Sequence, residues 1–254
     1  MTKFNFTYII PFKYTDDRFL TLERVLQNIR NSNINCEVII IEQGLESILP
    51  SKNIISNENY IFMNNSLPFN KSWSLNVAWK TATTDTIVFG DADNLIDMNH
   101  ILSSIEELKD YDFVSPHIKL IDLQPNENKL PSEDIFNIKR PGRGELDHQK
   151  LPMCGAMTIF TKDALERIGG WPEEFFGWGA EDDAMSIKVK HFLKWKENDN
   201  NCYHLYHNRV NPDMNWYGRN IQIYNNYSQI SKEKLEEYIN STKPLIGDKN
   251  RKLA

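Results

Sequence analysis

The sequence has 254 residues, of which 40% are hydrophobic and 25% charged, an ordinary globular composition that excludes disorder, collagen and coiled coil. Its 29 basic and 35 acidic residues give a formal charge of −6, so no positive field exists to neutralise phosphates, and nucleic acid is not an expected partner. The three cysteines are widely spaced, which favours free thiols in a reducing compartment.

Targeting signals are the next feature to consider. The stretch Met1–Lys13 lacks the cationic region, the apolar run and the cleavage site of a signal peptide, and no apolar run approaches the length of a membrane span. We therefore expect a cytoplasmic protein. Contact with the inner face of a membrane, through a partner or a tail, stays open.

The first half of the chain alternates short β-rich runs with helical patterns, which predicts a mainly parallel sheet covered by helices. Apolar residues recur at helical spacing after Asp16 and Asp17, and a second helix is predicted over Pro68–Thr81 with Pro68 in its first turn. The predicted strands are Phe6–Phe12, which Pro11 is expected to stop, Glu37–Glu42, Tyr60–Met63 and Thr86–Phe89.

The second half contains one long polar stretch, His117–Leu151, of the kind that forms functional loops or lids. A short helix is predicted to begin at Thr161, a good N-cap, and to end at Gly169-Gly170. The other predicted elements are a helix over 94–110, strands at Asp112–Ser115 and Ala156–Phe160, a helix ending near Lys196, a strand-like segment Cys202–His207 and an amphipathic helix from Ser231.

The first chemical signal is Asp91-Ala92-Asp93, which directly follows an apolar strand. Carboxylates two positions apart, on a turn at the carboxyl edge of a parallel sheet, can hold a divalent cation where ligands usually bind such sheets. The same pattern arises by chance in an acidic protein, so a solvated turn in which Asp91 caps the next helix remains the alternative.

A pair of histidines, His204 and His207, is the second signal. Imidazole together with carboxylate suits Mn²⁺, Zn²⁺ or Fe²⁺ better than Ca²⁺. The alternative is that one histidine packs in the core and the other lies in solvent.

The third signal is the aromatic and acidic run Gly170–Asp183. Glu181 and Asp182 stand at the start of a predicted helix, whose N-terminus favours their ionised forms, and a carboxylate so placed can take a proton from a hydroxyl. Acidic residues often only decorate a helix start. That explanation does not account for Trp178, which two glycines flank and which offers a flat apolar platform for a sugar ring on a mobile turn.

In collinear order over residues 8–209, these features resemble the GT-A-fold glycosyltransferases, specifically the β-1,4-galactosyltransferase-like group and its family 2 relatives. Tyr8–Lys13 is similar to that family's I-P-F-[RK] strand, which cradles the uracil of UDP, and Phe69–Asn76 is similar to its F-N-R-x-x-x-L-N helix. The resemblance implies that the nucleotide is positioned by Pro11, Phe12, Lys13, Phe69 and Lys71.

Four further segments carry the resemblance. Asp91–Asp93 falls on the family's D-V-D, whose second Asp binds Mn²⁺, and Gly155–Thr158 falls on G-G-V-S, with Ala156 in place of a glycine that bears on sugar choice. Trp178–Asp183 is similar to W-G-G-E-D-D, in which the Asp after Glu is the catalytic base. Cys202–His207 aligns with the metal-binding C-R-M-I-R-H.

The resemblance implies one α/β domain of GT-A fold over residues 1–254, with a nucleotide-sugar part (1–115), an acceptor and catalytic part (116–230) and a C-terminal helix and tail (231–254). It also implies transfer of a hexose or N-acetylhexosamine, galactose type, from a UDP-sugar to a glycan or glycolipid hydroxyl, with inversion and with Mn²⁺, or Mg²⁺ instead, as cofactor. The implied metal ligands are Asp93, His204 and His207; the catalytic residues are Asp182 as base and Glu181; substrate binding falls to Asp91, Ala92, Gly155, Trp178 and Asp183. The segment Asn208–Asn220 resembles the family's mobile loop, which is expected to order over bound donor.

Three alternatives stay open. Retaining polypeptide N-acetylgalactosaminyltransferases have a C-S-H metal segment that would select His204, but their W-G-G-E-N has Asn where this chain has Asp182, and a carboxylate there favours inversion. A sugar-nucleotide-forming nucleotidyltransferase is disfavoured because residues 8–18 contain no glycine of its phosphate loop. A non-catalytic binder of carbohydrate or nucleotide sugar is the third.

Overall fold

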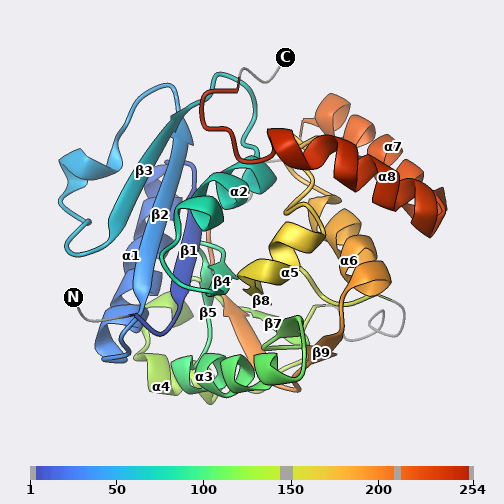
Figure 1. Cartoon of the computed structure of the whole chain (residues 1–254). Coiled ribbons are helices and arrows are strands. Elements are labelled where there is room, and N and C mark those ends of the chain that lie inside the picture. Colours follow the sequence, from blue (N-terminus) through green and yellow to red (C-terminus); the bar gives the residue numbers. More distant parts are fainter. Residues whose placement is uncertain (1–3, 144–150, 209–212, 252–254) are drawn as a thin grey trace.

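A seven-stranded sheet forms the centre of the computed structural model, which describes residues 4–143, 151–208 and 213–251 (Figure 1). The strand order is β3-β2-β1-β4-β8-β6-β9, and every neighbouring pair is parallel except the two that β8 forms with β4 and β6. The predicted mainly parallel sheet is therefore confirmed. The strands are β1 (Thr7–Phe12), β2 (Glu37–Gly44), β3 (Asn59–Asn64), β4 (Thr86–Gly90), β6 (Phe113–Ser115), β8 (Met157–Thr161) and β9 (Trp195–Glu197).

Helices cover both faces of this sheet. Side chains alternate between the faces along a strand, so that Tyr8 and Ile10 of β1 join one apolar cluster and Ile9 joins the other. The first cluster includes residues of α1 (Asp16–Asn31) and α3 (Met98–Glu106), and the second includes residues of α2 (Lys71–Thr81), α5 (Lys162–Arg167) and α6 (Glu181–Phe192). The result is a three-layer α/β/α arrangement.

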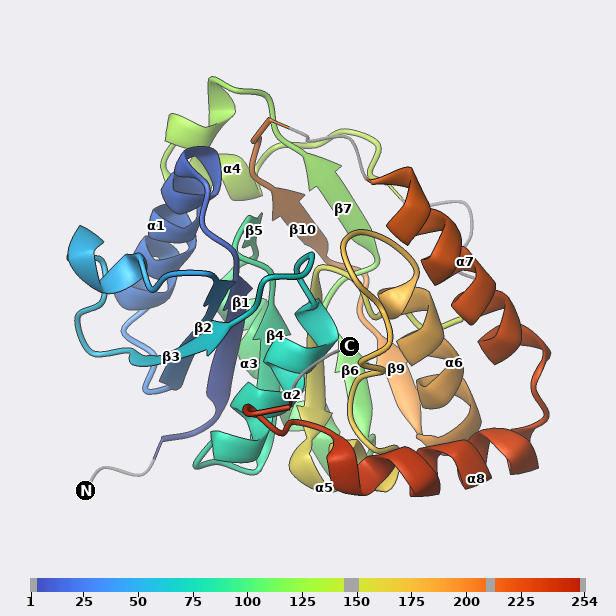
Figure 2. The same ribbon diagram turned by 90° about the horizontal axis from the view of Figure 1, so that it is seen from above.

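A small second sheet lies at one end of the molecule (Figure 2). Its order is β5 (Asn94–Leu95), β10 (Asn201–His204), β7 (Lys119–Asp122), with β10 antiparallel to β5 and parallel to β7. The pairing of β5 with β10 brings the turn after β4 next to the predicted histidine segment, although more than a hundred residues separate them in the chain.

Two further helices, α7 (Met214–Gln229) and α8 (Lys232–Thr242), pack beside α6 and form a third apolar cluster with it. Ser231 caps α8, as its side chain accepts a hydrogen bond from the backbone N–H of Lys234, so the predicted amphipathic helix from Ser231 is confirmed. The remaining helix, α4 (Ser132–Phe136), lies within the long polar stretch that also contains β7. No helix within the described ranges is long and apolar enough to cross a membrane.

Local capping explains where the predicted helix boundaries were right or wrong. Thr161 caps α5 by accepting from the N–H of Ala164, as predicted. The helix expected from Pro68 begins only at Lys71, because the side chain of Asn70 accepts from Trp73 N at 2.8 Å and so fixes the first turn there.

Three other boundaries differ because of strand pairing. β1 continues through Pro11, since β4 pairs only with Thr7–Ile9 and leaves the end of β1 with a neighbour on one side, where a residue without an N–H is tolerated. Residues 94–110 are not one helix, because Asn94–Leu95 pair with β10 as β5 before α3 begins. Likewise α6 ends at Phe192, and the residues after it pair with β6 as β9.

Candidate active site

The turn that follows β4 carries Asp91 and Asp93, and backbone hydrogen bonds hold it from two directions. Asp91 N donates to Ala156 O (3.0 Å) just before β8, and Leu205 N donates to Asp93 O (2.7 Å) just after β10. Ala92 between the two acids is buried in the apolar core. The turn is therefore fixed between the central sheet and the small sheet.

Asp93, His204 and His207 converge on one point. Asp93 Oδ2 lies 3.2 Å from His207 Nε2 and 3.9 Å from His204 Nε2, and one ligand atom from each of the three residues lies within 4.8 Å of the others. All three side chains are 15% exposed or less. A carboxylate and two imidazoles are the donor set that suits Mn²⁺, Fe²⁺ or Zn²⁺, so the residues present fit a divalent cation of this class.

A second carboxylate orients one of these histidines. His204 Nδ1 lies 3.2 Å from Asp122 Oδ1, which leaves Nε2 to face Asp93, and a carboxylate in this position is common behind metal-binding imidazoles. Burial lowers the pKa of His204, although Asp93 opposes that shift, whereas the hydrogen bond to Asp93 raises the pKa of His207. The directions differ because burial is the largest influence on the pKa of His204, whereas the hydrogen bond to Asp93 is the largest influence on the pKa of His207.

Asp93 is the acidic centre of this cluster. Burial would raise its pKa, but the hydrogen bond from His207 and the charges of His204 and Arg18 outweigh burial and lower the pKa to about 2. Arg18 Nη1 lies 3.6 Å from Asp93 Oδ2. The carboxylate is therefore ionised at neutral pH, as a metal ligand must be.

Lys71, at the first position of α2, joins the turn after β4 to the start of α6. Its Nζ lies 3.0 Å from Asp91 Oδ1, 3.2 Å from Asp182 Oδ1 and 3.8 Å from Glu181 Oε1. Burial alone would lower the pKa of Lys71, but the three carboxylates outweigh burial and raise it well above its usual value. Lys71 therefore stays charged and offsets part of the repulsion among three acids.

The acids around Lys71 are shifted toward the neutral form. Burial raises the pKa of Asp182 well above its ordinary value, and the charges of Glu181 and Asp91 add to that shift while Lys71 opposes it. Burial likewise raises the pKa of Glu181 and of Asp91. A carboxylate with a raised pKa is a stronger base, which is a property that proton abstraction needs.

Replacing Lys71 by Met tests this electrostatic arrangement. Removing the cation raises the pKa of Asp182 further, so the ionised base is lost at a higher pH as the pH falls. We expect the acidic limb of the kcat/KM profile, measured between pH 5 and 9 at saturating donor, to move to higher pH, so that activity falls more at pH 6 than at pH 8. The matched control is Lys190→Met, an exposed lysine on α6. Superimposable limbs for the two variants would contradict the prediction.

Trp178 stands on the loop before α6 and is 68% exposed. Gly177 and Gly179 on either side of it have φ values of 72° and 110°, a region that favours glycine. The indole stacks on Tyr217 of α7, with ring centroids 5.5 Å apart and an angle of 21° between the planes. Tyr217 therefore supports one face of the indole and leaves the other available to a sugar ring.

The segment Asn208–Asn220 was expected to be a loop, and part of it is not. α7 begins at Met214 because the side chain of Asp213 accepts from Asn215 N at 2.9 Å and caps the helix. Asn211-Pro212, which contributed to that expectation, lies outside the described residues. Ordering of the loop part over bound donor stays a prediction.

The residues expected to position the nucleotide differ in exposure. Phe12 is 1% exposed and packs in the core, and Pro11 is buried at the end of β1. Lys13 is exposed, and Phe69 is half-buried with its carbonyl accepting from Gly177 N at 2.8 Å. Of these four residues, only Lys13 and Phe69 thus offer side-chain surface to a ligand. Lys71, the fifth residue expected to position the nucleotide, instead contacts Asp91, Asp182 and Glu181.

Residues beside the expected base complete the site. A Cβ on Gly155 would lie 3.2 Å from Asp182 Oδ2, so this glycine leaves room next to the carboxylate. Ala156 and Ala180 have φ values of 61° and 68°, a left-handed conformation that is strained for alanine and that clusters at functional sites. Asp183 is exposed on the first turn of α6.

Four residues that the sequence did not single out take part in this site. They are Arg18, Asp122, Tyr217 and Asn220, and each acts through a partner far away in the chain. Asp122, for example, lies opposite His204 in the parallel pairing of β7 with β10. Only Arg18 could have been suspected from its place in the sequence, because it lies in the first turn of α1, the helix that follows β1.

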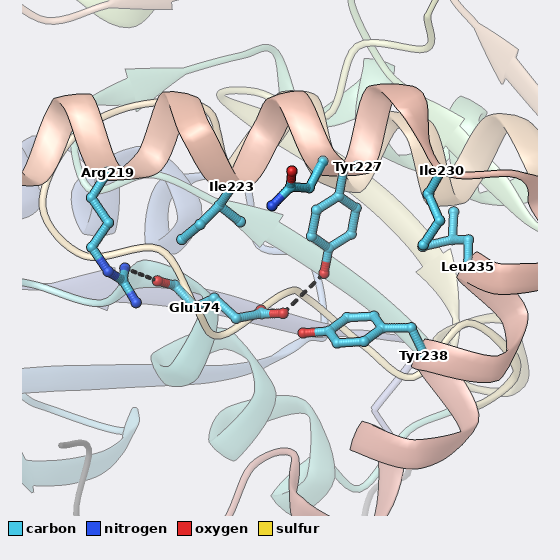
Figure 3. Close-up of a pocket in the computed structure, with 8 residues that line it drawn as sticks. Glu174, Arg219, Ile223, Tyr227, Ile230, Leu235 and Tyr238 are labelled. Atoms are coloured by element: carbon cyan, nitrogen blue, oxygen red, sulfur yellow. Dashed lines mark hydrogen bonds between the residues drawn. The ribbon is translucent and has the colours of Figure 1, made fainter.

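A separate cavity of about 310 Å³ lies between α7 and α8 (Figure 3). Its floor is Glu174, which belongs to the same loop as Trp178, and Arg219 and Tyr227 of α7 both point to Glu174. Arg219 Nη1 donates to the backbone carbonyl, and the Tyr227 hydroxyl donates to the carboxylate at 3.1 Å. The cavity thus lies next to the loop that carries Trp178, and none of Asp93, His204 and His207 lines it.

Comparison with known families agrees with this geometry. The family described as glycosyl transferase family 2 matches residues 8–169, more than half of the chain, and the family described as the N-terminal domain of galactosyltransferase matches residues 147–208. Among curated proteins, no relative matches the sequence significantly.

Solved structures show the same fold at low sequence identity. A mannosyltransferase from Pyrobaculum calidifontis, solved with GDP-Man and Mn²⁺, is 16% identical with a TM-score of 0.58, covering 96% of this chain and 72% of that one. GalNAc-T7, solved with UDP, GalNAc and Mn²⁺, is 14% identical with a TM-score of 0.62, covering 94% of this chain and 51% of that one. Drosophila β1,4-galactosyltransferase 7, solved with manganese, UDP-Gal and xylobiose, is 15% identical with a TM-score of 0.50, covering 80% of this chain and 71% of that one.

The match to the first family includes β1 to β4 and the turn with Asp91 and Asp93. The match to the second family includes the loop with Trp178 and the segment with His204 and His207. A nucleotide-sugar donor and a glycan acceptor are typical of such enzymes. The chain belongs to glycosyl transferase family 2 and is a nucleotide-sugar-dependent glycosyltransferase of GT-A fold and galactosyltransferase type.

Proposed function

We propose that this protein transfers a hexose or N-acetylhexosamine, of galactose type, from a UDP-sugar to a hydroxyl of a glycan or glycolipid, with inversion at the anomeric carbon. The observation that supports this most is the position of Lys71, whose Nζ contacts both Asp182 (3.2 Å) and Asp91 (3.0 Å). Through these contacts Asp182, the candidate base, lies beside the turn that carries Asp93. A donor held near Asp93 and an acceptor held near Asp182 would therefore be close enough to react.

The proposed step is a direct displacement. Asp182 takes the proton of the acceptor hydroxyl while that oxygen forms a bond to C1 of the donor sugar, and the bond between C1 and the phosphate oxygen breaks with release of UDP. Glu181 and Asp183 accept hydrogen bonds from acceptor hydroxyls, and Trp178 stacks on a sugar ring. Gly155 leaves the space beside Asp182 that the acceptor oxygen needs.

Asp93, His204 and His207 are the proposed ligands of Mn²⁺, with Mg²⁺ as the alternative cation. When bound, the cation supplies positive charge that stabilises the diphosphate as it leaves. Arg18, 3.6 Å from Asp93, adds a fixed positive charge on the same side. Lys13 and Phe69 are proposed to position the nucleotide, because their side chains offer surface to it.

Inversion is proposed because the residue after Glu181 is an aspartate. A single displacement needs a base on the acceptor side, and Asp182 has the raised pKa and the open space that such a base requires. A retaining enzyme has no such need. Following the anomeric proton of the product by NMR as it forms distinguishes the two stereochemical outcomes.

A thermal-shift panel tests the donor site. UDP, GDP and CDP are each added with Mn²⁺ or with EDTA, and a nucleotide present at about 100 times its dissociation constant adds about 2.7 kcal/mol of stability. We expect UDP to stabilise the protein only when Mn²⁺ is present. Stabilisation by GDP instead overturns the nucleotide assignment. No response from a cooperatively folded protein overturns the proposed donor site and favours a carbohydrate binder.

A further inference from the structure

Asn220 is a buried amide on an otherwise solvent-facing part of α7. It is 0% exposed, although its neighbours Gly218 and Arg219 are exposed. Burying an amide is unfavourable unless its polar groups are hydrogen-bonded. The partners of Asn220 therefore indicate why it is placed there.

Within the described part of the chain, the Asn220 side chain makes three hydrogen bonds, and all of them go to the backbone of the loop that carries Trp178. Oδ1 accepts from Phe176 N (3.3 Å), and Nδ2 donates to Phe176 O (2.9 Å) and to Trp178 O (3.3 Å). This pattern needs one acceptor and two donors on a planar group, which an amide provides. Asn220 therefore fixes the peptide groups on both sides of Phe176 and the peptide group that follows Trp178.

The loop needs such a fixed point. Gly177 and Gly179 give the backbone a wide range of conformations on either side of Trp178, and Ala180 holds a strained left-handed conformation with φ of 68°. Without contacts from another element, this loop could adopt several conformations, and the distance between the Trp178 indole and the start of α6 would vary.

Helix α7 supplies the rest of the contact. Tyr217 stacks on Trp178, and a Cβ on Gly179 would lie 3.0 Å from the Tyr217 ring, so the loop backbone lies directly against α7. Arg219 donates to the carbonyl of Glu174 at the start of the loop (Figure 3). The loop is thus held at its beginning, its middle and its end by one helix.

We propose that Asn220 is a positioning residue for acceptor binding: its amide sets the position of the Trp178 platform relative to Asp182. This inference rests on the proposed function and takes the sugar ring that stacks on Trp178 to be that of the acceptor. The proposed metal ligands (Asp93, His204 and His207) and Lys71 lie on other elements, so donor binding does not depend on Asn220. Loss of the amide raises the KM for the acceptor and leaves the affinity for nucleotide and Mn²⁺ unchanged.

The test variant is Asn220→Asp, which keeps the size of the side chain and one acceptor but removes both N–H donors. The matched control is Asn225→Asp, the same change at an exposed position of the same helix. Hydrogen–deuterium exchange of peptides covering residues 175–182 is the first readout, because it requires no activity. We expect exchange at least about tenfold faster in Asn220→Asp and unchanged in the control.

The second readout is kinetic, with UDP-galactose as donor and the p-nitrophenyl monosaccharide that the wild-type protein uses best as acceptor. We expect the acceptor KM to rise about tenfold, kcat to change less than about threefold and nucleotide affinity to stay within about twofold. If Asn220→Asp melts below the assay temperature, the uncharged Asn220→Ser replaces it, with Asn225→Ser as control.

Each outcome decides the matter. Unchanged exchange in the loop overturns the positioning role. Faster exchange with an unchanged acceptor KM shows that Asn220 has only a structural role and also overturns it. If the wild-type protein transfers no sugar, the proposed function is wrong, and so is the role of Asn220 in acceptor binding. The exchange measurement still shows in that case whether Asn220 fixes the loop.

Discussion

Replacement of Asp182 by Asn is expected to lower kcat about 100- to 1000-fold while nucleotide binding stays intact. The amide cannot accept the proton of the acceptor hydroxyl, and general-base catalysis is typically worth this factor. Asn fills the same space beside Gly155 and keeps an oxygen near Lys71, so the fold and the donor site are preserved. The measurement is steady-state transfer from UDP-galactose, with the thermal shift by UDP and Mn²⁺ recorded on the same preparation.

The matched control for this variant is Asp163→Asn. Asp163 also lies in the first turn of a helix, α5, but its side chain is 80% exposed, so the same chemical change leaves turnover within about twofold. Transfer by Asp182→Asn near the wild-type rate would show that another group accepts the proton. A lost thermal shift in that variant would instead show that Asp182 contributes to donor binding.

Asp93→Asn and His207→Gln are expected to remove most of the dependence of nucleotide binding on metal. Both side chains are 8% exposed, and Asp93 Oδ2 lies 3.2 Å from His207 Nε2. Neither a neighbouring side chain nor bulk water can take the place of either ligand without a loss of metal affinity. If the loss of one ligand weakens binding about 100-fold, the stabilisation of about 2.7 kcal/mol from UDP with Mn²⁺ falls to about 0.4 kcal/mol. The measurement is the difference in melting temperature between Mn²⁺ and EDTA.

Asp199→Asn serves as the control for the metal variants, since Asp199 is 75% exposed and pairs only at the surface with Lys119. It should keep the full metal-dependent shift. An equal response to Mn²⁺ in Asp93→Asn and in wild-type protein would rule out the proposed ligand set. Comparing differences rather than melting temperatures removes the effect that each substitution has on the protein without metal.

Local signals were sufficient to predict the first strands of the central sheet and the start of one helix. The apolar runs of β1, β2 and β4 and the cap at Thr161 depend on residues that are neighbours in the chain, so periodicity and N-cap preference identify them. The position of β8 depends on pairing with two strands at once, and no local pattern contains that information. The same holds for β9, whose residues continue the preceding helical pattern in sequence.

The candidate site shows the same division. The resemblance brought together Asp93, His204 and His207 in advance, and the structure places them within one cluster. It could not identify Asp122 or Asn220, because their roles exist only through strand register and helix packing. The prediction of a mobile turn at Trp178 did not include the contacts of this loop with α7, because they join residues that are far apart in the sequence.

The antiparallel insertion of β8 between β4 and β6 has a consequence for biosynthesis. A nascent chain that ends before Met157 contains β1, β2 and β4 but exposes the edge of β4 where β8 will pair. Such an edge can pair with other chains, which makes truncated products of this protein prone to aggregation. The cluster of Asp93, His204 and His207 forms later still, because both histidines follow β8 in the chain, so a cation that these residues held could assist folding only after most of the polypeptide has been synthesised.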